Sequence, residues 1–201
     1  MNPGFFKLSE ERRNEIINAG FRIFAQNPYK KAPVAEIAKE AGISKALLFY
    51  HFKNKKEIYM FLWEKALELT TKEIEKQNIL GTKDFFEMMR RSLKGKCNLT
   101  RKYPYASEFS LRAYYEENPE IRQGIQNNFR EISEESEKRV FEVIDTTTLR
   151  DDINLHEMYR EMIWAADGYM HNVMLQGNID ADKIEADFNK LITLWKKVYE
   201  K

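Results

Sequence analysis

The stretch Ile43–Tyr59, ISKALLFYHFKNKKEIY, combines aromatic rings, a histidine and four lysines within two short helical patterns. Ser44 is a favourable N-cap and predicts a short helix that runs to about His51. Leu48 and Phe52 lie four residues apart on one side of this helix, which we assign to the core. The opposite side then carries apolar and aromatic groups, whereas an ordinary solvated helix carries charges. Such a face indicates a partner surface.

The segment before this helix has the pattern of a second short helix. Val34, Ile37, Ala38 and Ala41 recur at the spacing i, i+3, i+4, i+7 of one helix face. Gly42 follows, where a left-handed C-cap is favoured. Two short helices joined by a tight glycine turn predict a helix-turn-helix. An ordinary αα-hairpin would use the same small residues, so the aromatic outer face is what favours a DNA-reading module.

The outer face suits the major groove of duplex DNA. Ala46 and Leu47 are suited to thymine methyl groups, Lys45 to base edges, and Tyr50 and His51 to phosphate oxygens. More lysines stand at the start of the following helix, where the helix dipole also favours phosphate. The charge distribution agrees with this interpretation, because residues 1–60 carry a net charge of +5 and the remainder −4.

The run VAEIAKEAGISKALLFYHFKNKKEIY resembles the N-terminal DNA-binding domain of the TetR family of bacterial transcriptional regulators, over roughly residues 9–60. The resemblance implies that the helix after Ser44 enters the major groove and that an aromatic-aromatic-His-Phe sequence is followed by a lysine, here Lys55. Pro33 stands where relatives often have a capping threonine, so no hydroxyl contact to phosphate is expected there. The expected DNA-binding residues are Val34, Ser44, Lys45, Ala46, Leu47, Phe49, Tyr50, His51, Lys53 and Lys55.

The rest of the chain is predicted to be helical throughout. Glycine and proline are scarce and apolar residues recur at three and four. We expect helices beginning at Ser9 and Pro33, then at about 44–51, 55–80, 83–100, 104–117, 119–145, 154–176 and 180–200. The predicted fold is therefore all-α with about nine helices. An N-terminal three-helix helix-turn-helix domain (1–54) is fused to a larger helical effector-binding and dimerisation domain (55–201).

The resemblance also implies an effector pocket and a dimer interface in the second domain. Aromatic, methionine and charged residues suggest a pocket for a bulky apolar or aromatic ligand: Phe61, Phe85, Phe86, Met89, Tyr105, Phe109, Arg112, Phe129, Trp164 and Asp167. Aromatics at helical spacing also fit a plain core. Apolar stripes on the last two helices suggest a four-helix dimer interface: Met158, Met162, Ala165, Tyr169, Phe188, Leu191, Ile192 and Trp195. The same stripes also fit the chain's own core, and both interpretations stay open.

The sequence thus predicts a homodimeric, effector-responsive repressor that binds a pseudo-palindromic double-stranded DNA operator. We expect no catalytic residue, metal or cofactor, since Arg160 stands where an HExxH motif beginning at His156 would need its second histidine. The lone Cys97, the lack of a membrane-spanning apolar run and the lack of a signal peptide favour a cytoplasmic protein. One alternative is a helical adaptor that binds protein through the same aromatic face. A helical enzyme is a further alternative.

Overall fold

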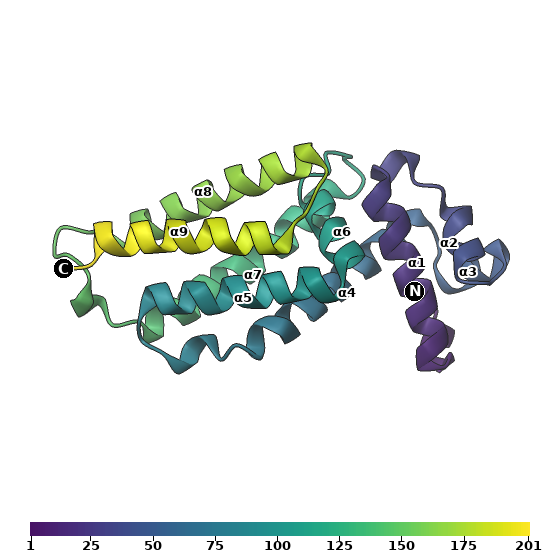
Figure 1. The fold of residues 1–201 in the computed structure, drawn as a ribbon. Helices are drawn as coiled ribbons and strands as arrows, with labels where there is room; N and C mark the ends of the chain where they lie inside the picture. Colours follow the sequence, from purple (N-terminus) through teal and green to yellow (C-terminus); the bar gives the residue numbers. More distant parts are fainter. The chain divides into compact units, whose positions relative to one another are not determined.

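The computed structural model describes residues 1–201 and is all-α, as predicted (Figure 1). It contains no strand, and its one isolated β-bridge joins Leu149 to Glu200. None of its helices has the length and apolar character needed to cross a membrane. The nine α-helices are α1 (Glu10–Gln26), α2 (Val34–Glu40), α3 (Lys45–His51), α4 (Lys55–Glu75), α5 (Phe85–Lys102), α6 (Pro104–Tyr114), α7 (Arg122–Val143), α8 (Leu155–Gln176) and α9 (Ala181–Tyr199). The short 3-10 helices are η1 (Pro3–Lys7), η2 (Tyr29–Lys31), η3 (Ile79–Gly81) and η4 (Thr146–Thr148).

The chain divides into two compact units by its internal contacts. The first unit comprises Met1–Leu69 and Tyr103–Arg130, and the second comprises Thr70–Lys102 and Glu131–Lys201. The helix-turn-helix therefore packs together with α6 and the beginning of α7. The boundary predicted at residue 54 separates a DNA-binding domain from an effector-binding domain, whereas the two compact units are defined by packing contacts. The functional boundary therefore stays a prediction.

The first unit is built on the local signals of its sequence. The Ser9 side chain caps α1 by accepting a hydrogen bond from the Arg12 amide at 3.2 Å, and the Ser44 side chain caps α3 from the Leu47 amide at 3.0 Å. Gly42 has φ +61°, which confirms the predicted left-handed C-cap. The Arg12 guanidinium donates to the carbonyls of Ala41 and Gly42, each at 3.0 Å. Helix α1 thus fixes the turn between α2 and α3.

The second unit is a helical bundle in which α5 packs along α9 (Figure 1). One core cluster is formed by Phe85, Phe86, Leu149, Met158, Met162, Ile192 and Trp195. A smaller one is formed by Cys97, Ala181, Ile184 and Phe188. An ion pair of 2.7 Å between Asp84 and Lys196 joins the beginning of α5 to the end of α9.

The structure differs from the predicted helices at two places. Helix α4 ends at Glu75, about five residues earlier than predicted, because Asn78 adopts a left-handed conformation with φ 47° and starts η3. The N-terminal residues, for which no element was predicted, form η1. Phe5 of η1 is fully buried against Phe52 and Phe61, with ring centroids 5.1 and 5.3 Å apart.

Candidate DNA-reading surface

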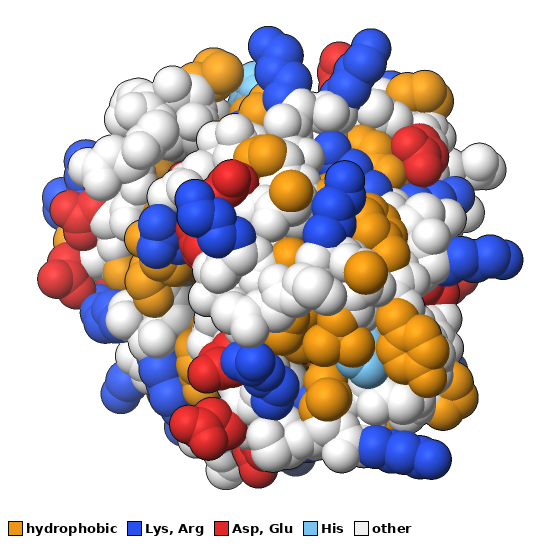
Figure 2. Space-filling view, turned by 90° about the vertical axis from the view of Figure 1, so that its right-hand side faces the viewer, with side chains coloured by type: hydrophobic (Ala, Val, Ile, Leu, Met, Phe, Trp, Pro, Cys, Tyr) orange, Lys and Arg blue, Asp and Glu red, His pale blue; other side chains and the backbone are white.

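Helix α3 has one buried and one exposed face, as predicted. Leu48 and Phe52 are buried, whereas Ser44, Lys45, Ala46, Leu47 and Tyr50 are exposed. Tyr50 keeps 62% and Leu47 39% of the surface of an isolated residue, so that α3 presents several large apolar groups to solvent on one face. Phe49 is half-buried, and the Lys45 ammonium lies 5.9 Å from the centre of its ring. Figure 2 shows apolar side chains, in orange, gathered in the lower right of the face, with Lys and Arg side chains, in blue, around them.

His51 does not lie on the exposed face, contrary to the prediction. Its side chain is 3% exposed and packs against the ring of Phe5, with centroids 5.7 Å apart. Neither ring nitrogen has a hydrogen-bond partner in the protein, and burial lowers the pKa of the imidazole. The cause is η1, which covers this end of α3 and donates a backbone hydrogen bond of 2.8 Å from Asn2 to the His51 carbonyl.

Lys55 also has surroundings that the sequence pattern did not predict. Its ammonium donates to the carbonyls of Ala32 at 2.8 Å and Lys30 at 3.2 Å, and it lies 5.2 Å from the centre of the Tyr29 ring. Burial lowers the pKa of Lys55. Lys55 is therefore engaged in closing η2, so a contact with phosphate would compete with these two hydrogen bonds.

Other lysines of this unit are free to meet a polyanion. Lys53 and Lys56, at the beginning of α4, are exposed. Lys30 and Lys31 in η2 are exposed as well and were not predicted as DNA contacts. The signal for them was the lysine doublet just before Pro33, on the approach to α2. Of the remaining predicted contacts, Val34 is half-buried at the first position of α2.

The residues predicted for an effector pocket lie in several different surroundings. Phe61, Phe109 and Arg112 belong to the first unit, where both phenylalanines are core residues and Arg112 donates to the Ala25 carbonyl at 2.6 Å. In the second unit, Phe85, Phe86 and Met89 belong to one apolar cluster. Tyr105, Phe129 and Trp164 are exposed and Asp167 is half-buried. The aromatic pattern did not separate core residues from ligand contacts, because both require apolar side chains at helical spacing.

The residues predicted for a dimer interface are mostly covered within the chain itself. Met158, Met162, Phe188, Ile192 and Trp195 are buried, whereas Ala165, Tyr169 and Leu191 are half-buried. The exposed apolar residues of α8 and α9 are different ones: Ile163, Trp164, Leu175, Leu194 and Val198. The predicted residues therefore lie mostly on the inward faces of these two helices, and the outward faces carry the exposed apolar groups.

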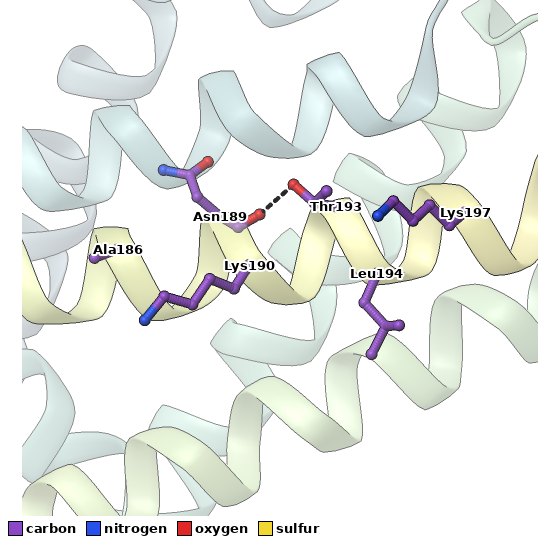
Figure 3. A pocket seen from close by; sticks show the side chains of 6 residues that line it. All are labelled: Ala186, Asn189, Lys190, Thr193, Leu194 and Lys197. Atoms are coloured by element: carbon purple, nitrogen blue, oxygen red, sulfur yellow. Dashed lines mark hydrogen bonds between the residues drawn. The ribbon is translucent and has the colours of Figure 1, made fainter.

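A shallow groove of about 440 Å³ runs along the outward face of α9 (Figure 3). Its lining residues all come from this helix: Ala186, Asn189, Lys190, Thr193, Leu194 and Lys197. Figure 3 shows the Thr193 hydroxyl bonded to the Asn189 carbonyl, at 2.7 Å, while the lysine chains extend along the helix surface. The groove is therefore a feature of one helix surface.

Comparison with known proteins identifies the first unit's helix-turn-helix. Residues 16–60 match the family of bacterial regulatory proteins named tetR. The HTH-type transcriptional regulator HbdR of Aromatoleum sp. is 34% identical over 71 residues, which cover 35% of this chain and 31% of HbdR. The chain thus spans less than a third of the length of such curated relatives.

Solved structures extend the likeness of fold to nearly the whole chain. The fatty acid degradation regulator FadR of Bacillus halodurans superposes with a TM-score of 0.73 at 16% identity, covering 98% of this chain and 96% of that protein. FadR of Bacillus subtilis in complex with stearoyl-CoA gives 0.71 at 18% identity, covering 90% and 96%. The motif at Val34–Tyr59 thus lies largely within the residues that match the tetR family, which identifies a TetR-family DNA-binding domain in the N-terminal part of the chain, and nearly the whole chain shares the fold of these solved regulators.

Proposed function

We propose that this regulator is an effector-responsive repressor that binds a pseudo-palindromic operator as a homodimer. The exposed face of α3 carries the proposal, because Lys45, Ala46, Leu47 and Tyr50 form an apolar and basic edge on a helix short enough to enter a major groove. Lys53 supplies a phosphate contact at the beginning of α4. One reading helix per protomer would meet half-sites about 34 Å apart, or a multiple of that distance.

The outward faces of α8 and α9 support dimerisation. Regulators of this family usually act as dimers. On this chain, Trp164 is 66% and Leu194 is 55% exposed, and Ile163 and Val198 are also exposed. Apolar groups of this size on two adjacent helices favour burial against a second copy.

An apolar effector, with a long acyl chain as one possibility, is the ligand class that we propose. The relative from Bacillus subtilis was solved with stearoyl-CoA, which has such a chain. In this chain, the second unit contains the half-buried Met89, Leu93 and Tyr159 beside its larger apolar cluster. Thioether and aromatic side chains adapt readily to a bulky apolar guest. Binding would release DNA if the effector prefers a conformation that separates the reading helices, with a coupling of about 1–3 kcal/mol.

A gel-shift titration with the DNA upstream of the protein's own gene tests this function. The wild-type chain should form a discrete, salt-dependent complex that excess non-specific DNA does not remove. Lys45→Ala should relax the preference for operator over non-specific DNA, whereas Lys53→Ala should weaken both and lower the salt slope by about one. Lys138→Ala, an equal charge change at an exposed position of α7, is the matched control.

Two outcomes would contradict the proposal. One is the absence of a complex at low salt with folded protein. The other is a Lys138→Ala variant that loses as much DNA affinity as Lys53→Ala. The α3 face would then be a surface for another protein, and a pull-down that depends on Tyr50 would be the expected result instead.

A further inference from the structure

The corner between α6 and α7 makes polar contacts with the segment that leads into the helix-turn-helix. Glu116 accepts a hydrogen bond from the Tyr29 amide at 2.8 Å, and its other oxygen accepts from the Asn118 amide at 3.1 Å. Arg112, one turn earlier, donates to the carbonyl of Ala25 at the end of α1. All of these groups belong to the first unit. The corner therefore holds both the end of α1 and the first residue of η2.

Tyr29 is the centre of this arrangement. Its side chain is 3% exposed, and its ring meets that of Tyr59 edge-on, with centroids 5.1 Å apart. Burial, together with the nearby carboxylates of Glu120 and Glu116, raises the pKa of the phenol. The phenol is therefore neutral. Glu116 holds Tyr29 through its backbone amide.

Lys55 completes the arrangement from the other side of η2. It stands over the Tyr29 ring and donates to two carbonyls of the segment, as described above. Burial lowers its pKa, and the charge of Glu120 opposes that shift. Lys55 thus serves as the cation of the acidic corner while it closes η2.

Helix η2 depends on these outside contacts. Its N-cap, Pro28, makes no side-chain capping bond, and the segment has only three residues. It carries the exposed Lys30 and Lys31 and leads through Pro33 into α2. In a helix-turn-helix the first helix crosses the phosphate backbone, so the approach to α2 is a natural place for phosphate contacts.

We infer that Glu116 is a positioning residue for DNA binding, which holds η2 so that Lys30 and Lys31 meet the phosphate backbone. This inference rests on the proposed function. It assigns to this carboxylate an effect opposite in sign to its charge: although Glu116 repels DNA, removing it should weaken binding. A carboxylate that acts only through its charge would have the reverse effect.

The test is operator and non-specific duplex affinity, by fluorescence anisotropy, well below the melting temperature of every variant. Glu116→Ala should weaken binding to both duplexes by about three- to tenfold, the effect of one net hydrogen bond. Glu116→Gln should recover affinity, since its amide oxygen still accepts from the Tyr29 amide. Lys30→Ala and Lys31→Ala should each lower the salt slope by about one.

Glu64→Ala is the matched control, because Glu64 is an exposed carboxylate of α4 in the same unit. It should leave DNA affinity unchanged or raise it. If Glu116→Ala behaves like Glu64→Ala, the inference is wrong. A wild-type chain that binds no duplex would overturn the proposed function itself. The two failures can be told apart, because the inference is tested by comparing variants with a wild-type chain that does bind DNA.

Discussion

At the scale of single residues, the first unit contains a buried tyrosine whose hydroxyl has no hydrogen-bond partner in the protein. The ring of Tyr59 lies among those of Phe24, Tyr29 and Phe109, with centroids 4.8–5.1 Å apart. Its hydroxyl lost the hydrogen bonds of water on folding without gaining a bond in the protein.

Tyr59→Phe should therefore leave the free energy of unfolding unchanged or raise it by up to about 1 kcal/mol. Urea unfolding at neutral pH, followed by circular dichroism, measures this change. A Tyr59→Phe variant that loses more than about 1 kcal/mol would mean that its hydroxyl has a bond in solution.

Residue roles could be predicted from the sequence where they are local. Ser9, Ser44 and Gly42 were recognised because a cap or a turn depends on the few residues beside it. His51 and Lys55 were misplaced because their surroundings come from η1 and η2, distant in the sequence. No local pattern indicates that Phe5 covers His51 or that two backbone carbonyls bind the Lys55 ammonium.

At the scale of elements, the turn between α2 and α3 depends on the conformation of Gly42. A Cβ at this position would lie 3.6 Å from an Arg12 nitrogen, an ordinary contact, so space does not oppose a side chain. The positive φ does, because other L-residues disfavour it by about 1–2 kcal/mol. Gly168, within α8, has open space around its Cβ position and no positive φ.

Gly42→Ala should therefore lower the free energy of unfolding by about 1 kcal/mol. The same substitution at Gly168 should raise it by about 0.5–1 kcal/mol through helix propensity. Chemical unfolding of the two variants under identical conditions compares them directly. Equal effects of the same sign would contradict the assignment of Gly42 to a strained turn.

Most elements were predictable because helix periodicity and capping are short-range. The end of α4 was not predictable, because the sequence of residues 76–80 still has a helical pattern although Asn78 adopts a left-handed conformation. The surroundings of Phe109 could not be predicted either. Phe109 packs against Phe21, with centroids 5.5 Å apart, and becomes core in the first unit only because α6 packs on α1. That pairing is tertiary, and it has no signature in the spacing of α6 itself.

At the scale of the whole molecule, the proposed dimer depends on the faces of α8 and α9 that the chain itself does not cover. The inward faces are already covered within the chain, and a polar residue at Ile192 or Met162 would disrupt the monomer's core. Leu194, by contrast, is 55% exposed and lines the groove on α9. A charge at this position leaves the isolated chain nearly unaffected but would lie desolvated in a dimer, where it is costly unless paired.

Leu194→Lys should therefore shift the chain from dimer toward monomer with little change in helix content. It should also weaken operator binding more than binding to non-specific duplex. Only the operator has two half-sites that a dimer can bind at the same time with its two reading helices. Sedimentation over a range of protein concentrations measures the dimer dissociation constant. Leu80→Lys, at a 46% exposed leucine of η3, is the matched control and should remain dimeric. If both variants sediment as the wild type does, the protomers meet through another face, and the apolar groups of α9 require a different partner.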